Sequence, residues 1–242
     1  MRVLALVPAF NEASNLPGVL ADLAAAARRF PHDAVVIDDG SSDGTAAVAS
    51  GLGALVLRSP INLGIGGAVQ TGYLWARQHA YDIAVQLDGD GQHDPAEMEA
   101  LAGPILQGRA DLVVGSRFLA AGGFRSTALR RAGIGYLSAL LRLRCGGRFT
   151  DPTSGFRAAG PRALALFAAS YPSDYPEPES LAVATRAGLR VVEVPARMRD
   201  RAHGRSSIGA LRTIYYLFKV TLAILLLPIR GATPARAEEG AA

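Results

Sequence analysis

Short runs of valine, leucine, isoleucine and alanine alternate along this chain with segments whose apolar residues recur at helical spacing. Such alternation is typical of parallel strands that are covered by helices on both faces. It predicts strands at residues 3–7, 34–38, 54–58, 83–87 and 112–115. We therefore expect an α/β fold with a Rossmann-like, doubly wound and mostly parallel sheet.

The helical segments carry recognisable start signals. Between the first two strands, Pro17 falls in the first turn of an apolar helical pattern, and Ser14 or Asn15 can cap it. The second half is less regular, and predicts helices at residues 128–142, 161–169 and 179–187 and a strand at residues 191–194. Small and charged residues fill positions 231–242, which predicts a disordered tail.

Polar residues cluster where four of the predicted strands end. The clusters are Asn11-Glu12, Asp38-Asp39-Gly40-Ser41, Asn62-Leu63-Gly64 and Asp88-Gly89-Asp90. The carboxyl ends of parallel strands meet at one edge of a sheet, and ligands of doubly wound sheets lie outside that edge. The four segments therefore predict a single ligand site.

The acidic turn after the fourth strand has the chemistry of a divalent metal site. Asp88 and Asp90 are separated by one small residue, so both carboxylates can reach a cation that carries diphosphate oxygens. Oxygen ligands suit Mg²⁺ or Mn²⁺, and Gln92 and His93 are possible further ligands. The alternative is a structural turn in which the aspartates accept backbone hydrogen bonds. We expect His93 and His203 to be loop residues without a catalytic partner.

The acidic pair after the second strand has two possible roles. One carboxylate, that of Asp38, can cap the following turn with Ser41 and Ser42. The other can accept hydrogen bonds from ribose hydroxyls or from the N–H of a base. The two roles are compatible, one for each aspartate.

Composition narrows the class of partner and compartment. Half of the 242 residues are hydrophobic, which is enough for a substantial core. The formal net charge is +4 and Lys219 is the only lysine, so arginines carry nearly all the positive charge and favour anionic partners. Cys145 is the only cysteine, which excludes an intrachain disulfide. The amino terminus lacks a signal-peptide pattern, so we expect a reducing compartment.

Taken in order, the motifs resemble those of family 2 glycosyltransferases, which have the GT-A fold. The first half supplies Val7-Pro8-Ala9-Phe10-Asn11-Glu12, Asp38-Asp39-Gly40-Ser41-Ser42-Asp43-Gly44-Thr45, Asn62-Leu63-Gly64 and Gln86-Leu87-Asp88-Gly89-Asp90-Gly91-Gln92-His93. Gly115-Ser116-Arg117-Phe118, Asp151-Pro152-Thr153-Ser154-Gly155-Phe156-Arg157 and Val192-Glu193-Val194-Pro195 resemble the dolichyl-phosphate mannosyltransferase branch and its bacterial polyprenyl-phosphate relatives. The resemblance spans residues 2–208 and rests on the combined order of the motifs.

The resemblance implies an inverting glycosyltransferase that moves a hexose from a nucleotide sugar to a polyprenyl phosphate. By analogy, the nucleotide sugar is held by Pro8, Ala9, Asn11, Glu12, Asp39, Asn62, Gly64, Asp88, Gly89 and Asp90. Asp88, Asp90 and Gln92 are the implied ligands of Mg²⁺ or Mn²⁺, which stabilises the leaving diphosphate. Gly204-Arg205-Ser206 lacks the lysine common after this segment in the mannosyltransferase branch, which leaves GDP-mannose, UDP-glucose and UDP-N-acetylglucosamine open as donors.

The implied acceptor site is rich in arginine. Arg117, Arg130 and Arg131 match the region that binds the acceptor phosphate in the family, and Arg157 and Arg201 are further candidates. With Asp88 and Asp90, Arg117 completes the expected catalytic set. A phosphate acceptor is ionised at neutral pH and needs no base, whereas a sugar hydroxyl acceptor would need one. Glu179 is the candidate for that base, or it complements a helix dipole.

The carboxyl-terminal segment predicts contact with a membrane. Residues 214–227 are strongly apolar but contain Lys219 and precede Pro228, so the stretch is shorter than the ~20 residues that span a bilayer. We expect a transferase domain over residues 1–208 and an amphipathic helix over residues 209–230 that binds the membrane surface or a small membrane-protein subunit. A helix packed on the domain core is the alternative. The expected location is peripheral, on the cytoplasmic face.

Other classes fit less well. A nucleotidyltransferase usually needs a glycine-rich loop with a lysine near the amino terminus, which this chain lacks. Val69 stands where a dinucleotide-binding fingerprint has its third glycine, which disfavours an oxidoreductase. A transferase acting on a sugar hydroxyl in polysaccharide assembly and a non-catalytic nucleotide-sugar-binding subunit remain as alternatives. No nucleic acid partner is expected.

Overall fold

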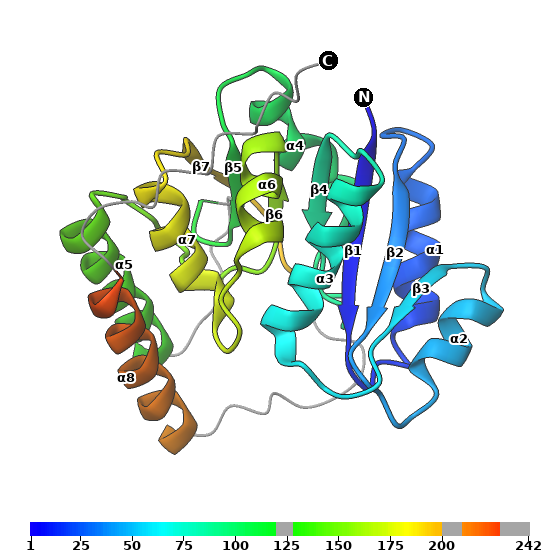
Figure 1. Cartoon of the computed structure of the whole chain (residues 1–242), viewed down its shortest axis with the longest axis horizontal. Helices are drawn as coiled ribbons and strands as arrows, with labels where there is room; N and C mark the ends of the chain where they lie inside the picture. The colour runs from blue at the N-terminus through cyan, green and yellow to red at the C-terminus, as the bar shows by residue number, and fades with distance from the viewer. Residues whose placement is uncertain (120–127, 200–209, 228–242) are drawn as a thin grey trace, which may run out of the picture.

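The computed structural model describes residues 1–119, 128–199 and 210–227. Its sheet has the strand order β3-β2-β1-β4-β6-β5-β7 (Figure 1). The strands are β1 (Val3–Ala9), β2 (Asp33–Asp38), β3 (Leu55–Arg58), β4 (Ile83–Gln86), β5 (Leu112–Ser116), β6 (Arg157–Ala159) and β7 (Val191–Pro195). All pairings are parallel except those of β6, which is antiparallel to both β4 and β5. The expected α/β class and mostly parallel sheet are confirmed.

The strands form where the sequence has apolar runs because both faces of the sheet are covered. Every residue of β1, β4 and β5 is buried, so neither face of these strands needs a polar side chain. Their predicted bounds differ from the observed ones by one or two residues. The strand β6 was not predicted, because its three residues, Arg-Ala-Ala, have no β-branched or aromatic member.

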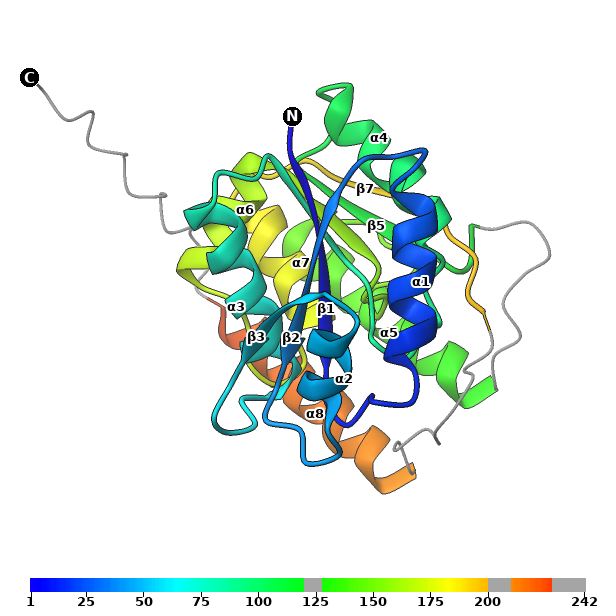
Figure 2. The ribbon, with the colours of Figure 1, turned by 90° about the vertical axis from the view of Figure 1, so that its right-hand side faces the viewer.

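Helices cover both faces, and Figure 2 places α1 and α3 on opposite sides of the sheet. One face carries α1 (Leu16–Ala26), α2 (Thr45–Gly51), the short 3₁₀ helix η1 (Pro95–Glu97) and α4 (Met98–Leu106). The other carries α3 (Gly64–Gln78), α6 (Pro161–Ala169) and α7 (Pro176–Arg186). Asn15 is the residue before α1, but its side chain bonds to Glu12 and not to the helix backbone.

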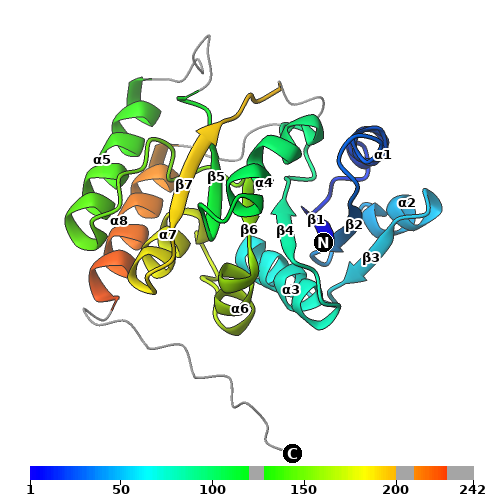
Figure 3. The ribbon, with the colours of Figure 1, turned by 90° about the horizontal axis from the view of Figure 1, so that it is seen from above.

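Two long helices, α5 (Ala128–Cys145) and α8 (Ala210–Leu226), lie beyond α7 at the β7 end of the sheet (Figure 3). Val220 and Ile224 of α8 are buried in the same apolar core as Leu137 and Leu141 of α5. The Tyr136 and Thr221 hydroxyls are 2.9 Å apart across the two helices. One face of α8 is therefore packed on the transferase core, as the alternative interpretation of this segment required.

The outer face of α8 remains apolar and exposed. Tyr215, Phe218, Leu222 and Leu225 recur every three or four residues and are 45 to 68% exposed. Among the described residues, no helix is long and apolar enough to cross a membrane. The segment that was expected to be amphipathic thus has two apolar faces, of which the core covers one.

Candidate active site

Two strand ends meet at the centre of the carboxyl edge. β1 lies between β2 and β4, and the Gly89 amide donates to the Pro8 carbonyl at 3.2 Å. A Cβ at position 89 would lie 3.0 Å from that carbonyl oxygen, so the acidic turn approaches β1 as closely as a glycine permits. Pro8 and Ala9 therefore border Asp88-Gly89-Asp90, as the motif order led us to expect.

The loop after β1 is fastened to the loop after β2. Asn11, with a positive φ of 58°, accepts a hydrogen bond from the Ser42 amide through its Oδ1 at 2.9 Å. Its own amide donates to the Ser41 hydroxyl at 2.9 Å, and the Glu12 amide donates to the Thr45 hydroxyl at the same distance. The two loops form one rigid border of the site.

The two aspartates at the end of β2 have different structural partners. Asp38 is fully buried and accepts from the Ser41 amide at 3.1 Å, which confirms its turn-capping role. Asp39 accepts from the Leu63 amide at 2.7 Å and from the Gly64 amide at 2.9 Å. Asn62 accepts from the same Gly64 amide through Oδ1. Asp39, Asn62 and Gly64 are thus brought together at the start of α3, and their contact with a nucleotide stays a prediction.

The carboxylates of the acidic turn differ in exposure. The Asp88 side chain is 37% exposed, whereas Asp90 is buried and accepts from the Gln92 amide at 3.0 Å. Gly155 lies beneath Asp88, since a Cβ at that position would be 3.1 Å from the Asp88 Oδ1. The Gln92 side chain reaches the Arg199 carbonyl at 3.5 Å. The loop that begins β6 therefore supports the carboxylate that is open to a ligand.

His93 lies in the loop after this turn, as expected, and is packed against Asp88. It is 4% exposed, and its Nδ1 accepts a hydrogen bond from the Asp88 amide at 3.0 Å. Its Nε2 lies 3.8 Å from the Asp88 Oδ2. The ring stacks on Phe156 with centroids 5.0 Å apart and planes 15° from parallel.

Arg117 follows β5 and is buried in a bidentate ion pair. Its Nε donates to the Asp151 Oδ2 at 2.6 Å, and its Nη2 donates to the Asp151 Oδ1 at 2.6 Å. The same Nη2 also donates to the Thr153 hydroxyl. Asp151 is fully buried and Arg117 is 5% exposed. Such a pair holds the Asp151–Gly155 loop against the end of β5. Acceptor binding by Arg117 stays a prediction.

Arg157 lies deeper than expected. It is 1% exposed, and its guanidinium donates to the Ser180 hydroxyl and to the carbonyls of Ser154, Pro152 and Glu177. These bonds join the start of β6 to the first turn of α7. The contacts give Arg157 a structural role beneath the site, which differs from the direct phosphate contact suggested by the resemblance.

Three helices bring charged and phenolic groups to the region of Arg117. Burial raises the pKa of Glu177, a partly buried residue in the first turn of α7. The charge of Arg157 lowers this pKa, that of Asp88 raises it, and that of Arg117 lowers it. Arg130, at the start of α5, is exposed, and partial desolvation together with the charge of Arg117 lowers its pKa. Burial and the charge of Glu177 raise the pKa of Tyr216, which α8 contributes. Glu177 thus lies within electrostatic reach of both the acidic turn and the arginines.

The remaining predicted acceptor residues are Arg131 and Arg201. Arg131 is exposed on α5. Arg201 falls outside the described residues, as do His203 and the predicted tail.

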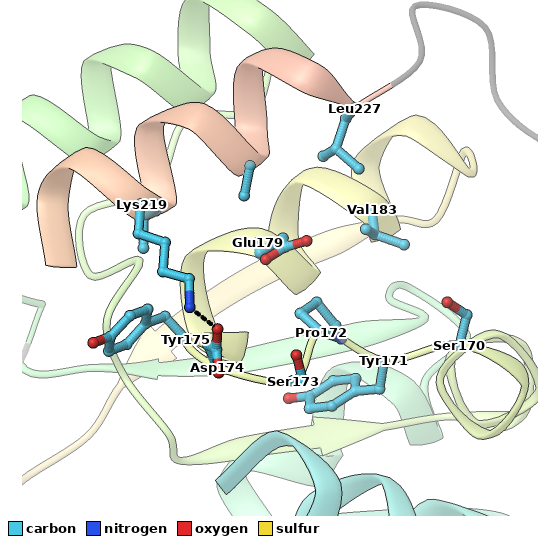
Figure 4. A pocket seen from close by; sticks show the side chains of 12 residues that line it. Ser170, Tyr171, Pro172, Ser173, Asp174, Tyr175, Glu179, Val183, Lys219 and Leu227 are labelled. Atoms are coloured by element: carbon cyan, nitrogen blue, oxygen red, sulfur yellow. Dashed lines mark hydrogen bonds and ion pairs between the residues drawn. The ribbon is translucent and has the colours of Figure 1, made fainter. Parts of the chain in front are cut away.

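Glu179 belongs to a separate cavity of about 320 Å³ between α7, α8 and residues 170–175 (Figure 4). Burial and the charge of Asp174 raise its pKa, while Lys219 acts in the opposite direction. Lys219 forms an ion pair with Asp174 across the mouth of this cavity. The glutamate of α7 whose pKa the charge of Asp88 raises is Glu177, two residues before the predicted Glu179.

The loop of residues 170–175 also contacts the start of α3. The Gly66 amide donates to the Ser173 carbonyl at 3.1 Å. A Cβ at position 66 would lie 2.1 Å from the Pro172 carbonyl oxygen, a distance that no side chain can occupy. This contact joins the start of α3 to the loop between α6 and α7.

The described residues contain no group of three or more histidine, cysteine, aspartate or glutamate side chains that would form a complete metal site. They offer an acidic pair with one open carboxylate instead. Mg²⁺ and related ions commonly take one or two carboxylates and complete their coordination with water and substrate phosphates. The donor set therefore fits a divalent cation that arrives with a diphosphate.

Comparisons with known proteins identify the family to which this chain belongs. Residues 5–164 match the family model described as Glycosyl transferase family 2, and the chain belongs to this family and is a glycosyltransferase. The chain is 33% identical to an undecaprenyl-phosphate mannosyltransferase of Micrococcus luteus, over 86% of this chain and 88% of the relative. It is 30% identical to a polyprenol monophosphomannose synthase of Mycolicibacterium smegmatis, over 90% and 85% of the two chains.

A solved structure has the same fold. Glucosyl-3-phosphoglycerate synthase from Mycobacterium tuberculosis, in complex with phosphoglyceric acid, superposes with a TM-score of 0.70 at 26% identity, covering 94% of this chain and 81% of the synthase chain. Another crystal structure of that synthase contains Mn²⁺, UDP and glucosyl-3-phosphoglycerate. The GT-A fold that the motifs implied is thereby confirmed.

Proposed function

We propose that this glycosyltransferase moves a hexose from a nucleoside diphosphate sugar to a polyprenyl phosphate, with inversion at the transferred carbon. One observation carries the proposal: the loop of residues 151–155 is bonded to Arg117 at Asp151 and lies against the Asp88 carboxylate at Gly155, so the acidic turn and this arginine border one site. An acidic pair suits a metal-bound diphosphate, and arginines suit an acceptor phosphate. The relatives named for polyprenyl phosphate acceptors support the same pairing.

The ends of β1, β2 and β4 supply the donor half of the proposed site. Pro8 and Ala9 form its floor, the Asn11 loop and the Asp39 loop form its borders, and Asp88 and Asp90 face the diphosphate. Mg²⁺ or Mn²⁺, bound by these two carboxylates with Gln92 nearby, would stabilise the charge that develops on the leaving nucleoside diphosphate. The synthase crystallised with Mn²⁺ and UDP supports this choice of ion.

Arg117 and Arg130 form the acceptor half. Their charges favour a phosphate whose second ionisation, with a pKa of about 6, is largely complete at neutral pH. The phosphate oxygen is then a nucleophile without any proton transfer. The chain's own task is to orient the acceptor and hold it opposite the leaving diphosphate.

The Glu177→Gln variant tests whether the acceptor needs a base. If a phosphate oxygen attacks, we expect kcat to stay within about tenfold of the parent, because no proton has to be removed. General base catalysis is worth roughly 10²- to 10⁴-fold, so a loss of that size would instead support transfer to a sugar hydroxyl. Glu179→Gln, which changes the neighbouring cavity, is the matched control and should leave kcat similar to the parent value.

The overall proposal is tested by incubating the purified protein with Mn²⁺, a polyprenyl phosphate and one labelled donor at a time. GDP-mannose, UDP-glucose and UDP-N-acetylglucosamine are each supplied separately. Label should move into the lipid fraction with one of them and depend on the polyprenyl phosphate. Absence of labelled lipid with all three donors would overturn the proposal for these substrates.

A lipid acceptor calls for a membrane-facing surface, and we infer that α8 provides it from the cytoplasmic side. Its exposed stripe of Tyr215, Phe218, Leu222 and Leu225 is apolar, and Tyr136 of α5 lies beside it. Exposed Arg142 on α5 adds a charge that favours anionic lipid. Tyr216 is on the opposite face of α8, and the charges of Glu177 and Arg117 act on its pKa. When the exposed stripe of α8 contacts the membrane, the acceptor half of the proposed site is therefore near the lipid.

Phe218→Ser should weaken binding to vesicles made of phosphatidylcholine and phosphatidylglycerol. Phe218 is 68% exposed, and burying such a side chain in the lipid is worth about 1.5–3 kcal/mol, which corresponds to roughly tenfold or more in partitioning. Leu52→Ser, at an exposed apolar position after α2, is the control and should bind like the parent. Co-sedimentation measures both, and equal binding of the two variants would remove α8 from the interface.

A further inference from the structure

The main-chain amide of Asp88 is hydrogen-bonded to a side chain that has no role in the transfer reaction proposed above. The Asp88 amide donates to the Nδ1 of His93 at 3.0 Å, and the same imidazole presents its Nε2 to the Asp88 carboxylate at 3.8 Å. One ring therefore faces both the backbone and the side chain of the exposed carboxylate. His93 itself is buried, so it is not a surface group that happens to lie near the turn.

The hydrogen bond fixes the tautomer of His93. Because Nδ1 accepts from an amide, the neutral ring carries its proton on Nε2. Nε2 lies 3.8 Å from the Asp88 Oδ2, which is too long for a hydrogen bond, so the ring holds Asp88 through its main-chain amide. Partners outside the coordination shell set the direction of a metal ligand in this way.

One further contact holds the ring, and two hold the backbone around it. Phe156 stacks on one face, at the position after Gly155, which lies beneath Asp88. An isolated antiparallel bridge pairs His93 with Met198, and the Arg199 amide donates to the Gln92 carbonyl at 2.9 Å. His93 is thus fixed by ring stacking on the β6 loop and by backbone pairing with the segment after β7.

We propose that His93 is a positioning residue that sets the direction of the Asp88 carboxylate for the metal-bound diphosphate. This inference rests on the proposed metal site at Asp88 and Asp90. His93 contacts Asp88 and not the reacting atoms, so its effect is on the binding of the cation with the nucleotide. The acceptor half of the site is not involved.

Two substitutions separate the hydrogen bond from the packing. In His93→Asn, the side-chain Oδ1 occupies the place of Nδ1 and can accept from the Asp88 amide. In His93→Phe, the ring and its stacking on Phe156 are kept and the acceptor is lost. Loss of one such bond corresponds to roughly three- to tenfold in an equilibrium constant.

The measurement is the binding of Mn²⁺ in the presence of UDP and, separately, GDP, followed by the electron paramagnetic resonance signal of free Mn²⁺. We expect His93→Asn to bind within about threefold of the parent and His93→Phe to bind roughly three- to tenfold more weakly. Thermal unfolding of each variant is recorded alongside. Equal Mn²⁺ affinity of His93→Phe and the parent, or equal weakening in both variants, would overturn the inference.

The same experiment separates this inference from the proposed function. If the parent chain shows no nucleotide-dependent Mn²⁺ binding, the metal site itself is wrong. If the parent binds and the variants do not differ, only the role of His93 is wrong. Should His93→Phe fail to fold, His93→Gln replaces it, because its amide reaches the position of Nε2 and not that of Nδ1, and it must then bind more weakly than His93→Asn.

Discussion

Replacing Asp90 by asparagine should lower kcat by about a hundredfold or more while leaving the fold intact. The amide oxygen of the new side chain can still accept from the Gln92 amide, so the turn keeps the bond that the parent makes at 3.0 Å. What is lost is the negative charge that holds the divalent ion, whose stabilisation of the leaving diphosphate is worth several kcal/mol. Turnover of the nucleotide sugar at saturating polyprenyl phosphate measures the effect.

The matched control for this experiment is Asp33→Asn. Asp33 begins β2 at the opposite edge of the sheet and is exposed, where its carboxylate accepts from the Tyr81 hydroxyl at 2.7 Å. The control should keep the activity of the parent. An Asp90→Asn enzyme that turns over within tenfold of the parent, with Mn²⁺ or Mg²⁺ present, would exclude Asp90 as a necessary metal ligand.

The second large effect is on stability. Arg117→Met should lower the free energy of unfolding by about 3–5 kcal/mol, because it leaves the fully buried Asp151 carboxylate without its cation. For a domain of this size that corresponds to a fall of roughly 6–20 °C in the unfolding temperature. Urea and thermal unfolding, followed by circular dichroism, measure both quantities.

Arg190→Met provides the comparison. Arg190 also makes a two-pronged pair, with both oxygens of Asp111, but its side chain is 55% exposed. Solvent screens such a pair, so the loss of stability should be much smaller. If the two variants unfold alike, the burial of the Arg117–Asp151 pair has no energetic consequence, and Arg117 is then free to act mainly on the acceptor.

The parallel strands could be predicted because each is a continuous apolar run, buried on both faces. β6 could not, because three short residues acquire strand geometry only from β4 and β5 on either side. The bounds of α7 were also misjudged: its helix begins at Pro176, where proline suits the first turn, and not at Glu179. Glu179 lines the cavity between α7 and α8, and Glu177 is the glutamate whose pKa responds to Asp88 and Arg117.

Motif order predicted which segments lie together at the carboxyl edge, since strand ends of a parallel sheet converge whatever the details of packing. It did not distinguish arginines that face a ligand from those that hold the protein together. Arg157 looked like a phosphate ligand, yet four protein oxygens accept its hydrogen bonds. His93 was considered as a metal ligand or a loop residue, but its contact with Asp88 was not predicted, because only the three-dimensional turn brings its Nδ1 to the Asp88 amide. An alternating Asp-Gly-Asp-Gly-Gln-His pattern gave a weak signal for this contact.

The contact of Gly66 with the Pro172 and Ser173 carbonyls has a bearing on how such enzymes can be recombined. The two backbones are so close that no methyl group fits between them, so the part of the chain before this contact cannot be exchanged freely between relatives. A hybrid of this chain with another acceptor half needs a glycine at position 66 together with a partner loop of matching path. The start of α3 and the loop of residues 170–175 therefore have to be exchanged together.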